Sequence, residues 1–245
     1  MNPSLGQVVW GTMRMLEHSA QTKYWVDFLH ELHERGIRSL HVSSEYESFD
    51  LAAECIRMCR QQGVKFRLYV KLAEPSFDDE GFSEKRFRSK VEYYLEALGV
   101  TQLGAIQWMW RAGLQNDDSR LAAYSQASEL VTQSINAEVA RGSVKEVRCF
   151  PYTTAFAEQV INNPSIHGLT VYRNGLESEY DRVIEQWGLV KKNVTTIRPF
   201  GSATGKVAID KDMAHTFALP AVDSTILTCT QQKHLQELYA YFEKD

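Results

Sequence analysis

Short apolar segments alternate with longer amphipathic ones along all 245 residues of the chain. The short segments are rich in β-branched and aromatic residues, and most are unbroken apolar runs, which is typical of parallel strands buried on both faces. We count eight such repeats. The predicted strands cover residues 7–12, 38–43, 65–72, 103–110, 146–152, 168–172, 194–200 and 224–229.

Three of the segments between these strands carry clear helical stripes of apolar residues. The stripes are Val91, Tyr94, Leu95 and Leu98; Tyr180, Val183, Ile184 and Trp187; and Leu235, Leu238, Tyr239 and Phe242. The seventh helix has the weakest pattern. Because no linker-like stretch divides the chain, we predict one domain over residues 1–245, an α/β protein folded as a single (β/α)8 TIM barrel. An open doubly wound sheet is the alternative.

Composition and charge narrow the class of partner. Hydrophobic residues make up 44% of the chain, enough for a well-filled core, and the formal net charge is −4 with no run of like charges. This balance argues against a nucleic-acid or anionic-lipid surface and favours small-molecule or protein partners. The first residues do not resemble a secretory leader and no long apolar run occurs, so we expect a cytoplasmic protein that does not enter the membrane.

The cysteines and paired histidines do not predict a metal site. The four cysteines are too few and scattered for a disulfide framework, and we expect them to be reduced. Cys55 and Cys59 belong to one apolar helical stripe, which favours core packing over metal binding. His30 and His33 have ligand spacing, but no carboxylate cluster completes the set, so a surface helix is the preferred interpretation.

Tyr46 and Lys71 lie at the C-terminal ends of the second and third predicted strands, on the face where barrels perform chemistry. A lysine beside a partly buried tyrosine lowers the pKa of the phenol and makes it a usable proton donor or acceptor. Alternatively, Tyr46 is a rim residue and Lys71 pairs with Glu45 or Glu74. His41, at the mouth of the second strand, is either a catalytic residue or a hydrogen-bonded interior histidine.

A series of segments, taken in order, resembles the aldo-keto reductases over nearly the whole chain. The segments are Val9-Trp10-Gly11-Thr12, His41 to Tyr46, Val70-Lys71, Leu98-Gly99-Val100, Val147-Arg148, Tyr172-Arg173-Asn174, Arg198-Pro199-Phe200, and Ile226 with His234-Leu235-Gln236-Glu237. The resemblance implies a barrel in which a tyrosine donates a proton to a carbonyl group while NADPH donates hydride.

The resemblance also implies a catalytic tetrad of Tyr, Lys, Asp and His, of which this chain retains half. Tyr46 matches the acid and Lys71 the lysine, whereas His41 stands at the aspartate position and Met109 at the histidine position. A thioether is only a weak acceptor and cannot polarise a carbonyl. If each loss costs about 10²-fold, ordinary carbonyl reduction falls by roughly four decades.

Binding residues follow from the same resemblance. We assign possible NADP(H) contacts to Thr153, Thr154, Thr170, Ser202, Thr204, Thr228 and Thr230, and substrate contacts to Trp10, Met109 and Trp110. Ile197 replaces the aromatic residue that would stack on the nicotinamide. The Gly201–Lys206 loop after the seventh strand and residues 228–230 before the last helix form the usual place for phosphate in a barrel, although such loops also arise as plain turns.

Three functions remain open at this point. The first is an atypical aldo-keto reductase with Tyr46, Lys71 and His41 as catalytic residues. The second is a non-catalytic binding or regulatory barrel. The third is a redox-neutral enzyme in which Lys71 or His41 acts as a base on a sugar-like or phosphorylated substrate.

Overall fold

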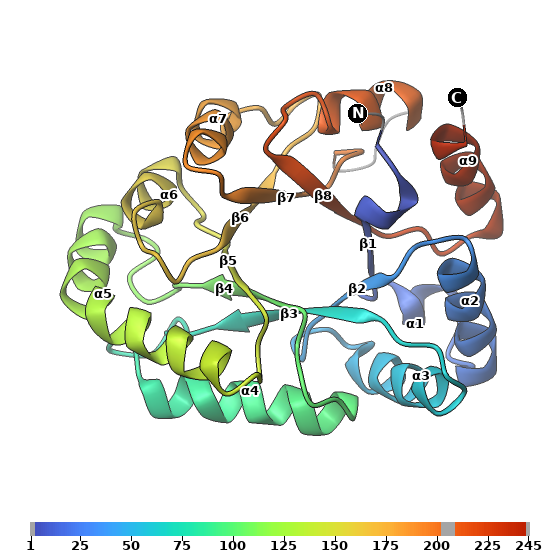
Figure 1. Ribbon diagram of the computed structural model, residues 1–245, viewed down its shortest axis with the longest axis horizontal. Coiled ribbons are helices and arrows are strands. Elements are labelled where there is room, and N and C mark those ends of the chain that lie inside the picture. Colours follow the sequence, from blue (N-terminus) through green and yellow to red (C-terminus); the bar gives the residue numbers. More distant parts are fainter. Residues whose placement is uncertain (1–2, 202–208, 244–245) are drawn as a thin grey trace.

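Eight parallel strands close into a barrel, each hydrogen-bonded to the next and β8 to β1. Figure 1 looks down on this ring in the computed structural model, which describes residues 3–201 and 209–243. The strands are β1 (Val8–Gly11), β2 (Ser39–Val42), β3 (Arg67–Ala73), β4 (Ala105–Met109), β5 (Val147–Cys149), β6 (Gly168–Tyr172), β7 (Asn193–Ile197) and β8 (Val222–Leu227). The predicted TIM barrel is therefore confirmed.

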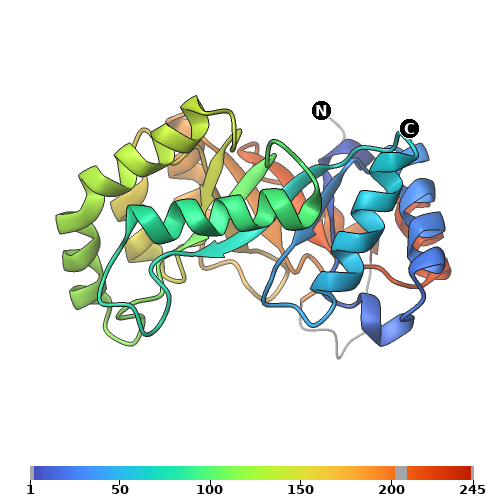
Figure 2. The same ribbon diagram turned by 90° about the horizontal axis from the view of Figure 1, so that it is seen from below.

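The helices surround the strands on the outside of the ring (Figures 1 and 2). They are α1 (Met15–His18), α2 (Thr22–Glu34), α3 (Phe49–Gln61), α4 (Glu84–Leu98), α5 (Asp117–Ala140), α6 (Thr154–Val160), α7 (Asp181–Leu189), α8 (Ile209–Thr216) and α9 (Gln232–Phe242), with a 3-10 turn, η1 (Leu5–Gln7), before β1. The three predicted stripes lie in α4, α7 and α9, with Tyr180 directly before the first residue of α7, and the weakly patterned seventh helix is α8. Within the described residues, no helix is long and apolar enough to cross a membrane.

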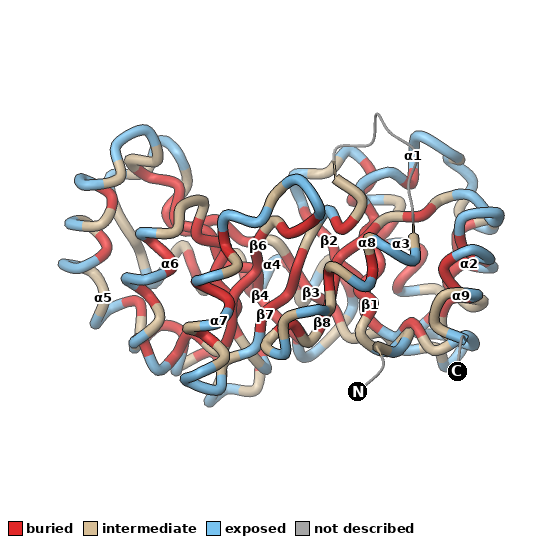
Figure 3. Tube along the Cα trace, turned by 90° about the horizontal axis from the view of Figure 1, so that it is seen from above, coloured by how far each residue is buried: buried red, intermediate tan, exposed pale blue. Residues whose placement is uncertain are grey.

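The main core lies between the barrel and its helices, because alternate residues of each strand point outward. Buried positions follow the strands while exposed ones lie on the outer helical surfaces (Figure 3). Cys55 and Cys59 of α3 belong to this core, as predicted, and all four cysteines are free thiols. Among residues 3–201 and 209–243, no cluster of three His, Cys, Asp or Glu residues could hold a metal ion.

Charged residues fill the interior near the N-terminal ends of the strands. Arg148 of β5 is 2% exposed and its Nη1 and Nη2 donate to the two carboxylate oxygens of Asp223 at 2.6 and 2.7 Å. Its Nε donates to Glu146 at 2.6 Å. This buried, fully paired charge occupies one end of the barrel, so the opposite end is where a ligand finds space.

Strands β5 and β7 end earlier than predicted, at Cys149 and Ile197 rather than near residues 152 and 200. Beyond them the backbone turns, and Tyr152 and Arg198 have φ angles of 65° and 57°. Such left-handed conformations are uncommon for non-glycine residues, and they interrupt an extended strand. The turn at Tyr152 directs this part of the chain into the loop at the mouth.

Candidate active site at the mouth of the barrel

A cavity of about 1010 Å³ opens at the C-terminal ends of the strands. Its inner part lies over the barrel and is lined by Gly11, His41, Tyr46, Lys71, Gln107 and Met109. Its outer part runs past residues 198–201, which follow β7, to the first turns of α9, where it is lined by Lys233, His234, Glu237 and Leu238. One continuous space thus joins the predicted catalytic residues to the last helix.

His41 connects Tyr46 to the floor of this cavity. Its Nε2 lies 2.7 Å from Gln107 Oε1, and its Nδ1 lies 3.4 Å from the Tyr46 hydroxyl. Because a carbonyl oxygen only accepts, Nε2 carries the proton, and Nδ1 accepts from Tyr46. Burial lowers the pKa of His41 to about 4. His41 is therefore neutral near pH 7, and it orients the Tyr46 phenol by accepting a hydrogen bond from its hydroxyl.

Lys71 does not lower the pKa of Tyr46 as expected from the sequence. Its Nζ lies 2.6 Å from Glu45 Oε2 and 5.8 Å from the centroid of the Tyr46 ring. Burial, and then the negative charge of Glu45, raise the pKa of Tyr46 above its ordinary value. The expectation is wrong because burial disfavours the phenolate and, in addition, a carboxylate one residue before the tyrosine offsets the charge of Lys71.

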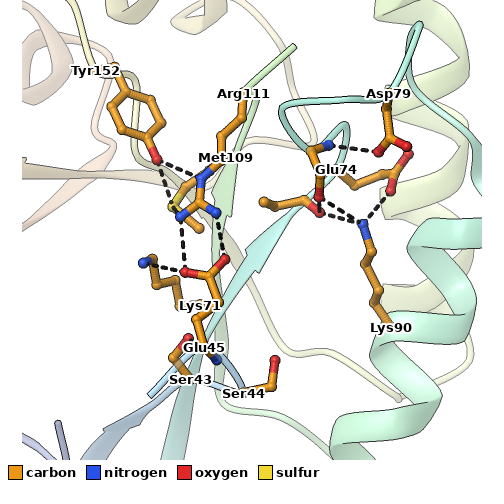
Figure 4. A network of polar contacts seen from close by, with 12 residues as sticks. Ser43, Ser44, Glu45, Lys71, Glu74, Asp79, Lys90, Met109, Arg111 and Tyr152 are labelled. Atoms are coloured by element: carbon orange, nitrogen blue, oxygen red, sulfur yellow. Dashed lines mark hydrogen bonds and ion pairs between the residues drawn. The ribbon is translucent and has the colours of Figure 1, made fainter. Parts of the chain in front are cut away.

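Glu45 also binds Arg111, in the loop after β4 (Figure 4). Arg111 Nη1 and Nη2 donate to the two oxygens of Glu45 at 2.5 and 3.1 Å, and its Nε donates to the Tyr152 hydroxyl at 2.8 Å. Burial alone would raise the pKa of Glu45, but its hydrogen bonds to Arg111 and Lys71 outweigh this and lower it. Glu45 is thus an ionised bridge between two cations.

Met109 lies at the centre of this arrangement, 1% exposed and lining the cavity. Arg111 Nη2 and the Tyr152 hydroxyl donate to its Sδ at 3.5 and 3.4 Å. Met109 packs with Ala73 and Phe150. It is therefore placed where a substrate could touch it, and its contact with substrate remains a prediction.

The structure does not bring Trp10 and Trp110 to the cavity. Both are fully buried in the outer core, where Trp10 packs against Trp25 and Phe28 of α2, and Trp110 lies edge-on to Trp108. Residues at alternate strand positions face opposite sides, so Met109 points inward and its neighbour Trp110 outward. The assignment of Trp10 and Trp110 to substrate is corrected to packing.

The predicted cofactor contacts divide into three groups. Thr228 lines the cavity, and its hydroxyl donates to Gly11 O at 3.1 Å. Four other threonines do not line the cavity. Thr153 accepts from Phe156 N at 3.2 Å as the N-cap of α6, and Thr154 is the first residue of that helix. Thr170 is buried in β6, and the Thr230 carbonyl accepts from the Tyr24 hydroxyl. Ser202 and Thr204 lie outside the described residues.

Basic and aromatic side chains that were not predicted from the sequence also line the cavity. Arg14, Arg198 and Lys233 contribute to its walls, and Arg198 Cζ lies 4.5 Å from the centroid of the Tyr172 ring. Tyr172 in turn packs edge-on against Phe150 at 5.3 Å. Cations beside a wall of rings suit a ligand that has anionic phosphates and a flat aromatic group.

Solved structures of similar shape come from the aldo-keto reductases. The chain shares 17% identity with a protein from Pseudomonas aeruginosa assigned to this group, at a TM-score of 0.77 with 96% of this chain and 89% of that one covered. A holo aldo-keto reductase of Bacillus halodurans shares 10% identity with the chain at a TM-score of 0.76, with 100% of this chain and 91% of that one covered. A Klebsiella pneumoniae aldo-keto reductase in complex with NADP and acetate shares 15% identity at a TM-score of 0.70, with 97% of this chain and 86% of that one covered.

Neither a family model nor a curated protein matches the sequence significantly. At the identities found, the structural likeness establishes the fold, and the resemblance seen in the sequence is confirmed at that level.

Proposed function

We propose that the protein binds NADP(H) in the mouth cavity and acts as a slow, atypical carbonyl oxidoreductase. The observation that carries this proposal is the continuity of the cavity, which places Tyr46 and His41 at one end and Arg198 and Lys233 at the other. The similar Klebsiella pneumoniae structure holds NADP in the same fold.

The residues of the outer cavity fit a phosphorylated dinucleotide. Arg198 and Lys233 would bind its phosphates, because guanidinium and ammonium groups pair with phosphate oxygens. Tyr172 lines the cavity and offers a ring near the inner end, where the sequence has Ile197 in place of the expected aromatic residue. The bound cofactor would supply hydride.

Tyr46 would supply the proton. Its raised pKa keeps the phenol protonated at neutral pH, and a carbonyl oxygen at the mouth would take the hydrogen bond that the hydroxyl donates to His41 at 3.4 Å. The Gln107–His41 pair fixes the phenol without removing its proton, because the pKa of His41 is about 4. A phenol of raised pKa is a weaker acid than one activated by a free lysine, so the reaction is slow.

A second candidate, a non-catalytic binding barrel, is favoured by one observation. Glu45 pairs with Lys71, which removes the free cation that the resemblance assigns to catalysis. The same ion pair argues against Lys71 as the base of a redox-neutral reaction, because the Lys71 amine is held by Glu45 at 2.6 Å.

Titration with NADPH and NADH tests the binding step. We expect quenching of protein fluorescence or a thermal shift at millimolar dinucleotide or below, and weaker binding of NADPH to Arg198→Ala. Arg182→Ala, which changes an exposed arginine on α7, is the matched control and should bind like the wild type. Failure of both dinucleotides to bind the wild-type protein would sink the proposal.

A further inference from the structure

Tyr152 occupies the side of the cavity where the resemblance calls for a histidine. That position is Met109 in this chain, and the Tyr152 hydroxyl donates to its Sδ at 3.4 Å. Tyr152 itself lines the cavity, and its φ of 65° turns the chain at the end of β5. Strained backbone at a bulky residue is a feature that folds retain where a side chain must be placed for function.

Arg111 fixes the phenol from the other side. Its Nε donates to the Tyr152 hydroxyl at 2.8 Å, while its two terminal nitrogens are held by Glu45. The guanidinium also lies 5.0 Å from the centroid of the Phe77 ring. Glu45, Lys71 and Arg111 together carry two positive charges and one negative. The cation that reaches a phenol hydroxyl in this cluster is Arg111 (Figure 4).

This geometry leaves the hydroxyl proton of Tyr152 available. The phenol oxygen already accepts from Arg111, and the proton points at sulfur, which is a weak acceptor. A carbonyl or alkoxide oxygen in the cavity would be a much better acceptor than the thioether and would take this hydrogen bond.

We propose that Tyr152, positioned by Arg111, is a second hydrogen-bond donor to the substrate oxygen and takes the place of the histidine missing at Met109. The inference rests on the proposed carbonyl reduction. Tyr46 transfers its proton to the oxygen, whereas Tyr152 keeps its own and stabilises the negative charge that develops there. Burial raises the pKa of Tyr152, which keeps the phenol protonated as a donor.

Binding of acetate tests the donor without any turnover. Acetate is followed by NMR in the wild type, in Tyr152→Phe and in Tyr93→Phe, which removes a hydroxyl from an exposed tyrosine of α4. We expect the Tyr152→Phe change to weaken binding about tenfold, the worth of one hydrogen bond to a charged group, and Tyr93→Phe to leave it unchanged. Equal binding by the wild type and Tyr152→Phe, or none by the wild type, would overturn the inference.

Single-turnover reduction of a panel of aldehydes and ketones separates this inference from the proposed function. Tyr152→Phe should lower the rate about 100-fold with NADPH affinity unchanged. Arg111→Lys should also lower the rate, because one ammonium cannot reproduce the forked contact, but by a smaller factor, because the Tyr152 hydroxyl is still present. If the wild type reduces no carbonyl but acetate binding still depends on Tyr152, the proposed function fails and the donor stands. If the wild type and Tyr152→Phe reduce equally fast, the donor role is wrong and the reductase stands.

Discussion

Glu45 Oε2 lies 2.6 Å from Lys71 Nζ, and this contact changes the chemistry of the neighbouring Tyr46. Without a carboxylate there, a lysine at the end of β3 would favour the tyrosine phenolate. With it, burial and the charge of Glu45 raise the pKa of the phenol. The resemblance treats Tyr46 and Lys71 as a catalytic pair, but in this structure the charge of Glu45 offsets the charge of Lys71 beside the phenol.

The first prediction concerns Glu45→Gln. Removing the carboxylate leaves Lys71 uncompensated and deletes a charge that opposes ionisation of Tyr46, so the pKa of Tyr46 should fall. Ultraviolet titration of tyrosinate, compared with Glu45→Gln/Tyr46→Phe, identifies the phenol concerned. Reductive turnover should rise in the single variant. An unchanged titration curve would show that Lys71 does not act on Tyr46 even when its charge is free.

The second prediction is the pH dependence of reduction. The pKa of Tyr46 lies above the ordinary 10.0, so the phenol remains protonated throughout the neutral and mildly alkaline range. The reductive rate should therefore stay level up to about pH 10, the unperturbed value for tyrosine, and fall only beyond it. A decline between pH 7 and pH 9, measured by stopped flow with NADPH saturating, would contradict this assignment.

The third prediction links His41 to stability. Its pKa is lowered by burial from 6.5 to about 4, so the unfolded chain binds more protons than the folded protein between these values. The free energy of unfolding should fall as the pH drops from 6.5 towards 4, and be unaffected by this group above 6.5. Urea titrations should show this loss of unfolding free energy in the control variant His18→Gln, which changes an exposed histidine, as in the wild type. The loss should be smaller in His41→Gln.

The fourth prediction tests the reassignment of Trp110. Trp110→Phe should lower the free energy of unfolding by about 1–3 kcal/mol, because it removes buried volume from the outer core. NADPH affinity should stay at the wild-type value, since the side chain lies outside the cavity. Calorimetry and dinucleotide titration on the same preparation check both parts. A loss of NADPH affinity with the free energy of unfolding unchanged would show that Trp110 belongs to the binding site.

The barrel was predictable because its determinant is periodic. Unbroken apolar runs separated by amphipathic stripes specify buried parallel strands and covering helices, and these signals survive at identities too low to transfer function. The positions of Tyr46 and Lys71 at strand ends followed from the same pattern. The register within a strand followed less well, and Trp110 was assigned to the cavity although Met109, one residue earlier, faces it.

The electrostatics of the site could not be predicted from spacing alone. Glu45 is adjacent to Tyr46 in the sequence, but its side chain turns to Lys71 and to Arg111, which comes from two strands further on. The predicted fifth strand ends at Tyr152, but this residue has a left-handed backbone conformation and its hydroxyl accepts from Arg111. The one signal in the sequence that could have suggested these contacts is that charged and aromatic residues lie at or just after the ends of consecutive strands.

The most direct test of the proposed reductase is single-turnover oxidation of NADPH by the wild type and by Tyr46→Phe across a panel of aldehydes and ketones. Binding of NADPH to both proteins is established first, so that a lost rate reflects the chemical step. We predict slow, substrate-dependent oxidation by the wild type and a loss of about 100-fold or more in Tyr46→Phe. Equal rates in the two proteins, or no oxidation with any carbonyl compound despite NADPH binding, would contradict it.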